Sequence, residues 1–281
     1  MNQTYKYKPL TFFMVVFVVS WAFWIAAVIL GNQGQNVDVL ALLGLLAPSV
    51  TALIMIFLSK DVMLKKDFKH KVFGFFRVKP FSIMIVILVY AAVTAISILL
   101  STLFGQSFQQ FSFAEDFSFK EGGVMAIITL LLAGILEEIG WRSYGEDSLA
   151  NAYPWWKATL VFAIIWSLWH LPLFFIPDFY QYEILQLSPW FMVNFLVSII
   201  PITFFFTWLY VKNNRSILVC IIFHLFANFL QEKIAMTPET KCVQTFVFVI
   251  ATVILILLNK ELFFSEKHIG KLLENEKTSI S

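Results

Sequence analysis

The chain has 281 residues, of which 59% are hydrophobic and only 14% are charged. A water-soluble globule is excluded, because 32 Phe and 9 Trp residues would leave more apolar surface than one soluble core can bury. The formal net charge of +2 and the lack of a basic stripe also exclude a nucleic-acid-binding protein. The composition predicts a polytopic membrane protein, whose helices present apolar side chains to lipid.

Apolar runs of about twenty residues predict the membrane-spanning helices. In chain order they cover residues 10–30, 40–58, 81–103, 123–139, 158–176, 190–211, 217–230 and 243–258. The fourth and seventh runs are short and contain acidic, His or Asn residues. We predict an all-α membrane helix bundle of about eight spans, formed by residues 1–281 as one domain, with its motif-bearing core at about 121–230.

The distribution of positive charge predicts the orientation of the bundle in the membrane. With eight spans, 17 of the 20 Lys and Arg residues lie on the side of the two termini, and the exceptions are Lys120, Lys233 and Lys241. Both termini are therefore expected in the cytoplasm, with residues 261–281 as a charged cytoplasmic tail. The basic loop at 60–80 alternates Lys and Arg with Phe, which is typical of a segment on anionic headgroups. No ligand is assigned to it.

Three polar segments interrupt the apolar runs, at residues 137–142, 166–170 and 224–228. Such groups are costly inside a membrane unless they are paired or line a wet cavity. On a helix Glu138 and Arg142 are four residues apart and can pair, while Glu137 is rotated from Glu138 by about 100°. His224 and Asn228 also share one helix face. Taken singly, each segment is explained by an ion pair or by hydrogen bonds between helices.

The depth of these segments argues for a common site. If the fourth helix continues to about residue 149 and the fifth begins near Pro154, the hairpin turns near Ala152. Glu137 then lies fifteen residues before that turn and His170 eighteen residues after it, a difference in depth of roughly 5 Å. We therefore expect Glu137, His170, His224 and Asn228 to converge in one cavity that is reachable from the cytoplasmic half.

A carboxylate beside an imidazole can deprotonate a water molecule, and an imidazole with an amide can donate hydrogen bonds to a developing oxyanion. This combination predicts hydrolysis of an acyl group. Two His and one Glu are also a zinc-ligand set, which stays an alternative although no His-Glu-x-x-His motif is present. The sequence has no Gly-x-Ser-x-Gly motif and no Asp within an apolar run, which argues against a serine site and against an aspartyl site. Ser167, near His170, is a weak candidate for a dyad.

The three segments in this order resemble the CPBP intramembrane protease family. This family includes the type II CAAX prenyl endopeptidases and proteins linked to bacteriocin processing or immunity. The resemblance implies that Glu137 and His170 activate the hydrolytic water, that His224 and Asn228 form the oxyanion site, and that Glu138 and Arg142 support them. It also implies a glutamate mechanism without cofactor or metal. The second motif of the family usually opens with Phe, and Trp166 stands at that place.

The leading hypothesis is therefore an intramembrane endopeptidase in a multi-pass membrane protein. Its partners would be a membrane-associated peptide or protein, with or without a prenyl group, and membrane lipids, but no nucleic acid. The alternative from another class is a scaffold for bacteriocin immunity or regulation that cleaves nothing, and a metal-dependent protease stays open. A proton-coupled transporter is less favoured, because the sequence has no inverted repeat.

Overall fold

The computed structural model describes residues 7–74, 78–115, 117 and 123–265. In this described part the chain is all-α, with no strands beyond an isolated bridge between Phe113 and Ile234. The predicted fold class is therefore confirmed. The tail beyond residue 265, predicted to be cytoplasmic, lies outside the described residues.

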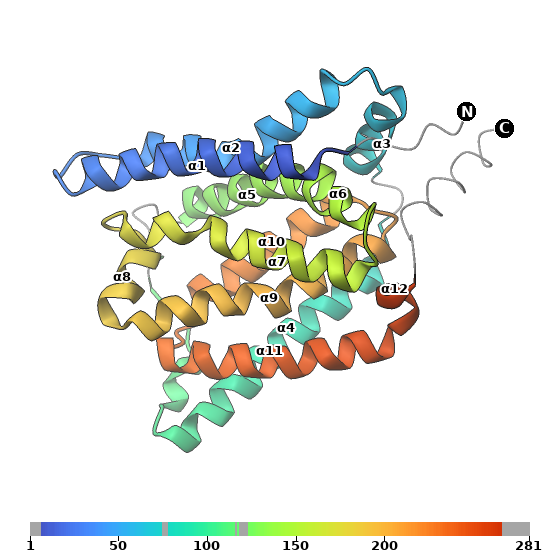
Figure 1. Cartoon of the computed structure of the whole chain (residues 1–281). Coiled ribbons are helices and arrows are strands. Elements are labelled where there is room, and N and C mark those ends of the chain that lie inside the picture. Colours follow the sequence, from blue (N-terminus) through green and yellow to red (C-terminus); the bar gives the residue numbers. More distant parts are fainter. Residues whose placement is uncertain (1–6, 75–77, 116, 118–122, 266–281) are drawn as a thin grey trace.

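The apolar runs form the long helices, which keep the labels of Figure 1. The helices are α1 (Pro9–Gly31), α2 (Asp38–Phe57), α3 (Val62–Phe73), α4 (Pro80–Ser101), α5 (Gly123–Gly140), α6 (Glu146–Ala150), α7 (Trp155–Trp169), α8 (Tyr180–Leu187), α9 (Pro189–Lys212), α10 (Ile217–Lys233), α11 (Pro238–Leu258) and α12 (Lys260–Phe264). Within the described residues, seven helical segments are long and apolar enough to cross a membrane. The seventh predicted run forms α10, which has only 17 residues. The chain is thus an integral multi-pass membrane protein.

Local sequence signals explain where several of these helices begin. Proline occupies the first turn of α1, α4, α9 and α11, where its missing N–H costs no helical hydrogen bond. The side chains of Ser188 and Thr237 cap α9 and α11 by accepting backbone N–H bonds. The hairpin between α6 and α7 turns at residues 151–153, as the sequence predicts, and Pro154 is the residue before the first turn of α7.

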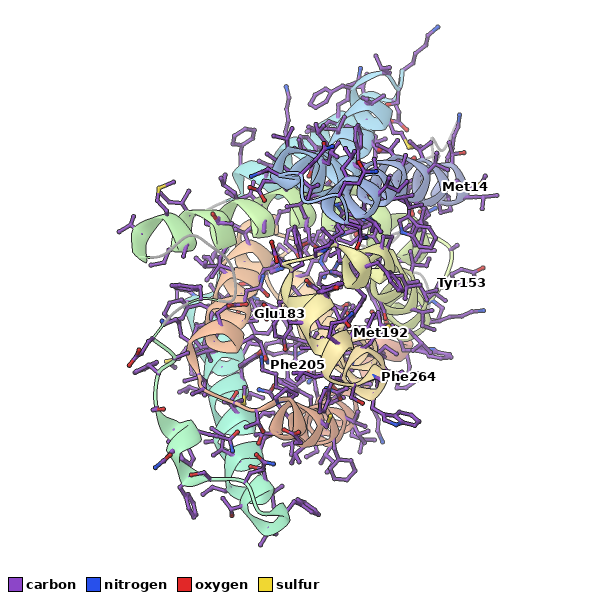
Figure 2. All side chains as sticks on the ribbon, turned by 90° about the vertical axis from the view of Figure 1, so that its left-hand side faces the viewer. Met14, Tyr153, Glu183, Met192, Phe205 and Phe264 are labelled. Atoms are coloured by element: carbon purple, nitrogen blue, oxygen red, sulfur yellow. The ribbon has the colours of Figure 1, made fainter. Side chains whose placement is uncertain are left out.

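The long helices lie side by side, with α2 packed on α5, α5 on α10, α7 on α9, and α11 on α4 and α9. One end of the bundle carries α3, α6 and α12, and the other carries the α1–α2 turn and α8 (Figure 1). Figure 2 looks onto this second end, where Glu183 on α8 lies in front of the bundle. Apolar side chains such as Met14 project outward, as they would toward lipid.

Helices α2 and α5 touch through their backbones. A Cβ atom on Gly140 would lie 2.3 Å from the carbonyl carbon of Pro48, so only glycine fits at this crossing. Next to it, the hydroxyl of Ser49 donates a hydrogen bond to the carbonyl oxygen of Leu136. This close contact fixes the part of α5 that carries Glu137.

Beyond Gly140 the fourth span continues through a π-helical turn (Trp141–Gly145) into α6. Every residue from Trp141 to Ala150 is buried, including the acidic residues Glu146 and Asp147. The segment therefore closes the bundle at the α3 end instead of projecting into solvent.

A buried ionic cluster joins α3 to this closed end. The Arg215 guanidinium donates to both oxygens of Asp67, at 2.9 and 2.7 Å, and to Asp147. Lys71 lies 2.7 Å from Asp67 and 2.6 Å from Asp147. Burial alone would raise the pKa of Asp67, but the charges of Arg215 and Lys71 and their hydrogen bonds outweigh it and lower that pKa below its ordinary value. Helix α3, in the predicted surface loop, is thus anchored to the bundle by charge.

Candidate active site

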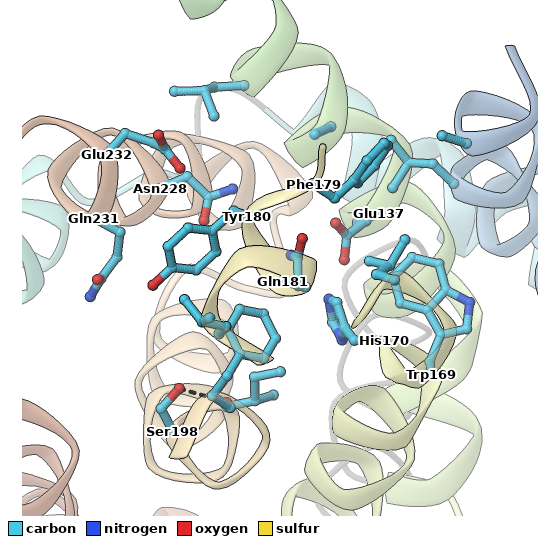
Figure 3. Close-up of a pocket in the computed structure, with 18 of the residues that line it drawn as sticks. Glu137, Trp169, His170, Phe179, Tyr180, Gln181, Ser198, Asn228, Gln231 and Glu232 are labelled. Atoms are coloured by element: carbon cyan, nitrogen blue, oxygen red, sulfur yellow. Dashed lines mark hydrogen bonds between the residues drawn. The ribbon is translucent and has the colours of Figure 1, made fainter. Parts of the chain in front are cut away.

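A cavity of about 760 Å³ extends from the middle of the bundle to the end with α8. Its lining includes all four residues predicted to converge, namely Glu137, His170, His224 and Asn228. Figure 3 shows Glu137 and His170 next to each other, with Asn228 and, beside it, Tyr180 across the cavity. The four side chains therefore line one cavity, as the residue spacing predicts. Their chemical roles stay predictions.

Glu137 as a residue is only 6% exposed, and α7 donates a hydrogen bond to its carboxylate. Its Oε2 accepts a hydrogen bond of 2.9 Å from Nε1 of Trp166. A Phe at this position, as in the motif of the resembling family, has no N–H to donate. The exchange of Phe for Trp is therefore more than a change of aromatic ring, because it adds a polar contact to the predicted general base.

His170 ends α7, and its ring is oriented by the last turn of that helix. Nδ1 lies 2.7 Å from the carbonyl oxygen of Trp166. Because a carbonyl oxygen can only accept, Nδ1 carries the proton, and on a neutral ring Nε2 is then left with its lone pair. Trp166 thus contacts both predicted water-activating residues, Glu137 through its side chain and His170 through its backbone.

His224 on α10 stands at one end of a chain of buried ionic contacts. Its Nδ1 lies 2.9 Å from Glu138 Oε1, and Arg142 Nε donates to Glu138 Oε2 at 2.7 Å. Arg142 also donates to Glu146, one turn beyond. The predicted Glu138–Arg142 pair is present, but Glu146 was missed although its spacing of four from Arg142 is readable in the sequence. The other ring nitrogen of His224, Nε2, lies 4.0 Å from Glu137 Oε1.

Asn228 lies one turn after His224 on α10 and is half-buried. Among the residues that the structure describes, no hydrogen bond is made by its side chain. Its amide is therefore available to a ligand in the cavity, as an oxyanion donor needs to be.

The geometry of the site bears on the metal and serine alternatives. Across the described ranges, no three His, Cys, Asp or Glu side chains are grouped closely enough to hold a metal ion. The Ser167 hydroxyl donates to the carbonyl oxygen of Leu196 at 2.7 Å, so it turns toward α9. The four residues predicted to converge bring one carboxylate, two imidazoles and one amide to the cavity.

The position of the cavity along the bundle bears on the predicted access from the cytoplasmic half. The cavity reaches the surface at Gln35 and Asn36 of the α1–α2 turn, whereas α1 begins and α12 ends at the opposite end of the bundle. Access to the cavity from the cytoplasmic half therefore stays a prediction.

The distribution of Lys and Arg predicts that the α3 end of the bundle is cytoplasmic. In a background with Cys220 and Cys242 replaced by Ser, we expect a membrane-impermeant maleimide to label Gln35→Cys in intact cells. Lys66→Cys, equally exposed at the other end, should react only after permeabilisation. The reverse pattern would contradict the prediction and would place the cavity opening in the cytoplasm.

These features define a polytopic membrane protein with a polar site inside its helix bundle. The sequence model of a family described as "Type II CAAX prenyl endopeptidase Rce1-like" matches residues 120–230. The chain is also 40% identical over 269 residues to CAAX prenyl protease 2 of Methanococcus maripaludis, covering 95% of this chain and 99% of that protein. The chain therefore belongs to the Rce1-like family of type II CAAX prenyl endopeptidases and is, by that membership, a membrane protease.

Proposed function

We propose that the protein is an endopeptidase that hydrolyses a peptide bond of a prenylated, CAAX-type membrane-associated substrate by means of a glutamate-activated water. The observation that carries the proposal is the convergence of Glu137, His170, His224 and Asn228 on one cavity. The prenyl group is taken from the names of the family and of the archaeal relative. The apolar aromatic walls of the cavity suit such a chain.

In the proposed reaction a water molecule lies between Glu137 and His170. Glu137 takes one proton from this water while the water oxygen attacks the scissile carbonyl carbon. His170 Nε2 accepts a hydrogen bond from the remaining O–H of the water. The carbonyl oxygen becomes an oxyanion. When the C–N bond breaks, Glu137 returns its proton to the leaving amine.

The oxyanion would accept hydrogen bonds from Asn228 and from Nε2–H of His224. Since Nδ1 of His224 already faces Glu138, this role needs a ring protonated on both nitrogens. Such a ring also balances charge, because Arg142 and a protonated His224 offset Glu138 and Glu146. Glu137, whose Oε1 lies 4.0 Å from Nε2 of His224, then shares this cation with Glu138.

The experiment is cleavage of an S-farnesyl-cysteine peptide and its unprenylated twin by the detergent-purified protein, with products identified by mass spectrometry. Cleavage of the prenylated peptide that survives a chelator is expected. If cleavage requires stoichiometric zinc, Glu137 and the histidines would instead be assigned as zinc ligands. No cleavage of either peptide would contradict the proposed activity.

Trp166→Phe tests whether the indole N–H orients the base. Removing a hydrogen bond to a charged group is worth about 1.5–3 kcal/mol, so kcat should fall at least about tenfold while KM changes little. Trp208→Phe is the matched control, since it loses an indole hydrogen bond of 3.0 Å to Asn259 away from the cavity. Equal rates in the two variants would remove the orienting role.

Asn228→Ala tests the oxyanion site. Loss of one oxyanion donor lowers kcat on the order of 10²-fold and leaves substrate binding nearly intact. Steady-state kinetics with the farnesylated peptide measure both quantities. An unchanged kcat would take Asn228 out of the mechanism.

A further inference from the structure

Helix α3 has two faces of opposite character. Its inner face packs against the bundle and carries the buried side chains of Leu64, Asp67, Phe68 and Lys71. At 100° per residue, side chains that are four, seven and eleven residues apart return to nearly the same direction. The exposed side chains that share this direction form the outer face of α3, namely Val62, Lys66, Lys69 and Phe73.

The outer face of α3 is positively charged, and its lysines are unpaired. In the described part of the chain no carboxylate lies within ion-pair distance of Lys66 or Lys69. Between residues 58 and 74 the acidic side chains are engaged elsewhere. Asp61 accepts backbone N–H bonds of 2.9 and 3.1 Å at the start of α3, and Asp67 is buried in the ionic cluster. The outer face therefore presents positive charge that no neighbouring carboxylate neutralises.

Apolar side chains flank the two lysines along this face. Val62 at the start of α3 is 75% exposed, and Phe73 at its end is 65% exposed. Leu58, just after the end of α2, is 79% exposed. Basic and apolar side chains on one exposed helix face are typical of a helix that lies at the boundary between lipid headgroups and acyl chains.

The chain holds α3 next to the membrane surface. Helix α2, a candidate membrane span, ends at Phe57, and α3 begins at Val62. The four residues between them reach at most about 14 Å. The buried ionic cluster also fixes the inner face of α3 to Asp147 and Arg215, at the end of the bundle shown in Figure 1. The outer face is therefore kept close to the headgroup layer, which is roughly 5–8 Å thick on each side of a bilayer.

We infer that the outer face of α3 binds the headgroup of an anionic phospholipid. Lys66 and Lys69 contact the phosphate, while Val62 and Phe73 lie among the adjacent acyl chains. The inference is independent of the proposed function, because no residue of this face lines the cavity. It agrees with the prediction that the α3 end is cytoplasmic, since the cytoplasmic leaflet has a negative surface potential.

The test titrates the full chain, purified in a neutral detergent, with phosphatidylglycerol or phosphatidylcholine of the same acyl chains. Native mass spectrometry gives the dissociation constant of the first bound lipid. Wild type should bind phosphatidylglycerol more tightly than phosphatidylcholine. Lys66→Gln combined with Lys69→Gln should weaken phosphatidylglycerol binding about thirtyfold and leave phosphatidylcholine binding nearly unchanged. Val62→Ser combined with Phe73→Ser should weaken the binding of both lipids, because it removes apolar contact.

The matched control is Lys157→Gln combined with Lys260→Gln, which removes two exposed positive charges from the same end of the bundle. It should bind both lipids as wild type does. Thermal unfolding in lipid-free detergent should be alike in all variants, because every changed side chain is exposed. Equal phosphatidylglycerol affinity in wild type and in the variant without Lys66 and Lys69 would overturn the inference. Tight binding of soluble polyglutamate that is lost in that variant would also overturn it, in favour of an acidic protein partner.

Discussion

Replacing Glu137 with Gln is expected to abolish peptide cleavage, with a loss of roughly 10²–10⁴-fold or more for removal of the general base. The amide keeps nearly the shape of the carboxylate, and its oxygen can still accept the hydrogen bond from Trp166. Expression and thermal unfolding in detergent should therefore stay close to wild type. Cleavage of the farnesylated peptide, followed by chromatography, measures the loss.

The control for this substitution is Glu183→Gln, a carboxylate on α8 that does not line the cavity. It should cleave at the wild-type rate. A fully active Glu137→Gln protein would refute the general-base role. If neither wild type nor variant cleaves any peptide while both are folded, the non-proteolytic scaffold becomes the better interpretation of the same bundle.

Arg142→Met is expected to cause the largest loss of stability. The Arg142 side chain is fully buried and pairs with Glu138 and Glu146, so its removal leaves Glu146 without a cation and Glu138 with His224 alone. Breaking a buried ion pair from one side costs about 3–5 kcal/mol. Because Glu138 also positions His224, the protein that does fold should cleave poorly. Thermal unfolding in detergent, with cleavage measured on the folded fraction, checks both effects.

Lys157→Met serves as the matched control for Arg142→Met. Lys157 is an exposed cation near the start of α7, with its ammonium over the Tyr153 ring. Its loss should shift the unfolding midpoint little, because an exposed charge gives up no hydration on folding. A midpoint in Arg142→Met equal to that of this control would show that the buried ion pairs add no net stability.

Much of the fold could be predicted from the sequence, because membrane helices need long apolar runs and prolines mark several of their first turns. The continuation of the fourth span past Arg142 was also predictable from the distance to Pro154. What hydropathy does not encode is the packing of polar segments. The basic loop gave no sign that Asp67 and Lys71 meet Asp147 and Arg215, which are more than seventy residues away.

For the candidate site, residue spacing predicted which side chains share a helix face, and so which ones meet at the cavity. Spacing says nothing about hydrogen bonds between helices. The N–H of Trp166 on Glu137 and the proton position on His170 come from interhelical and helix-end geometry. Lys241 was counted only as a charge in an outer loop, since its neighbours Tyr180 and Gln231 lie on other helices.

The π-helical turn at Trp141–Gly145 has a consequence for how this span can change. A π turn contains one residue more than the α-helical turn it replaces. Deleting a residue there would restore an α-helical turn, and because one full turn is still completed, Glu146 and Asp147 would keep their directions relative to Glu137. The span can therefore lose one residue at this turn without moving the reaction centre or the ionic anchor against their neighbours.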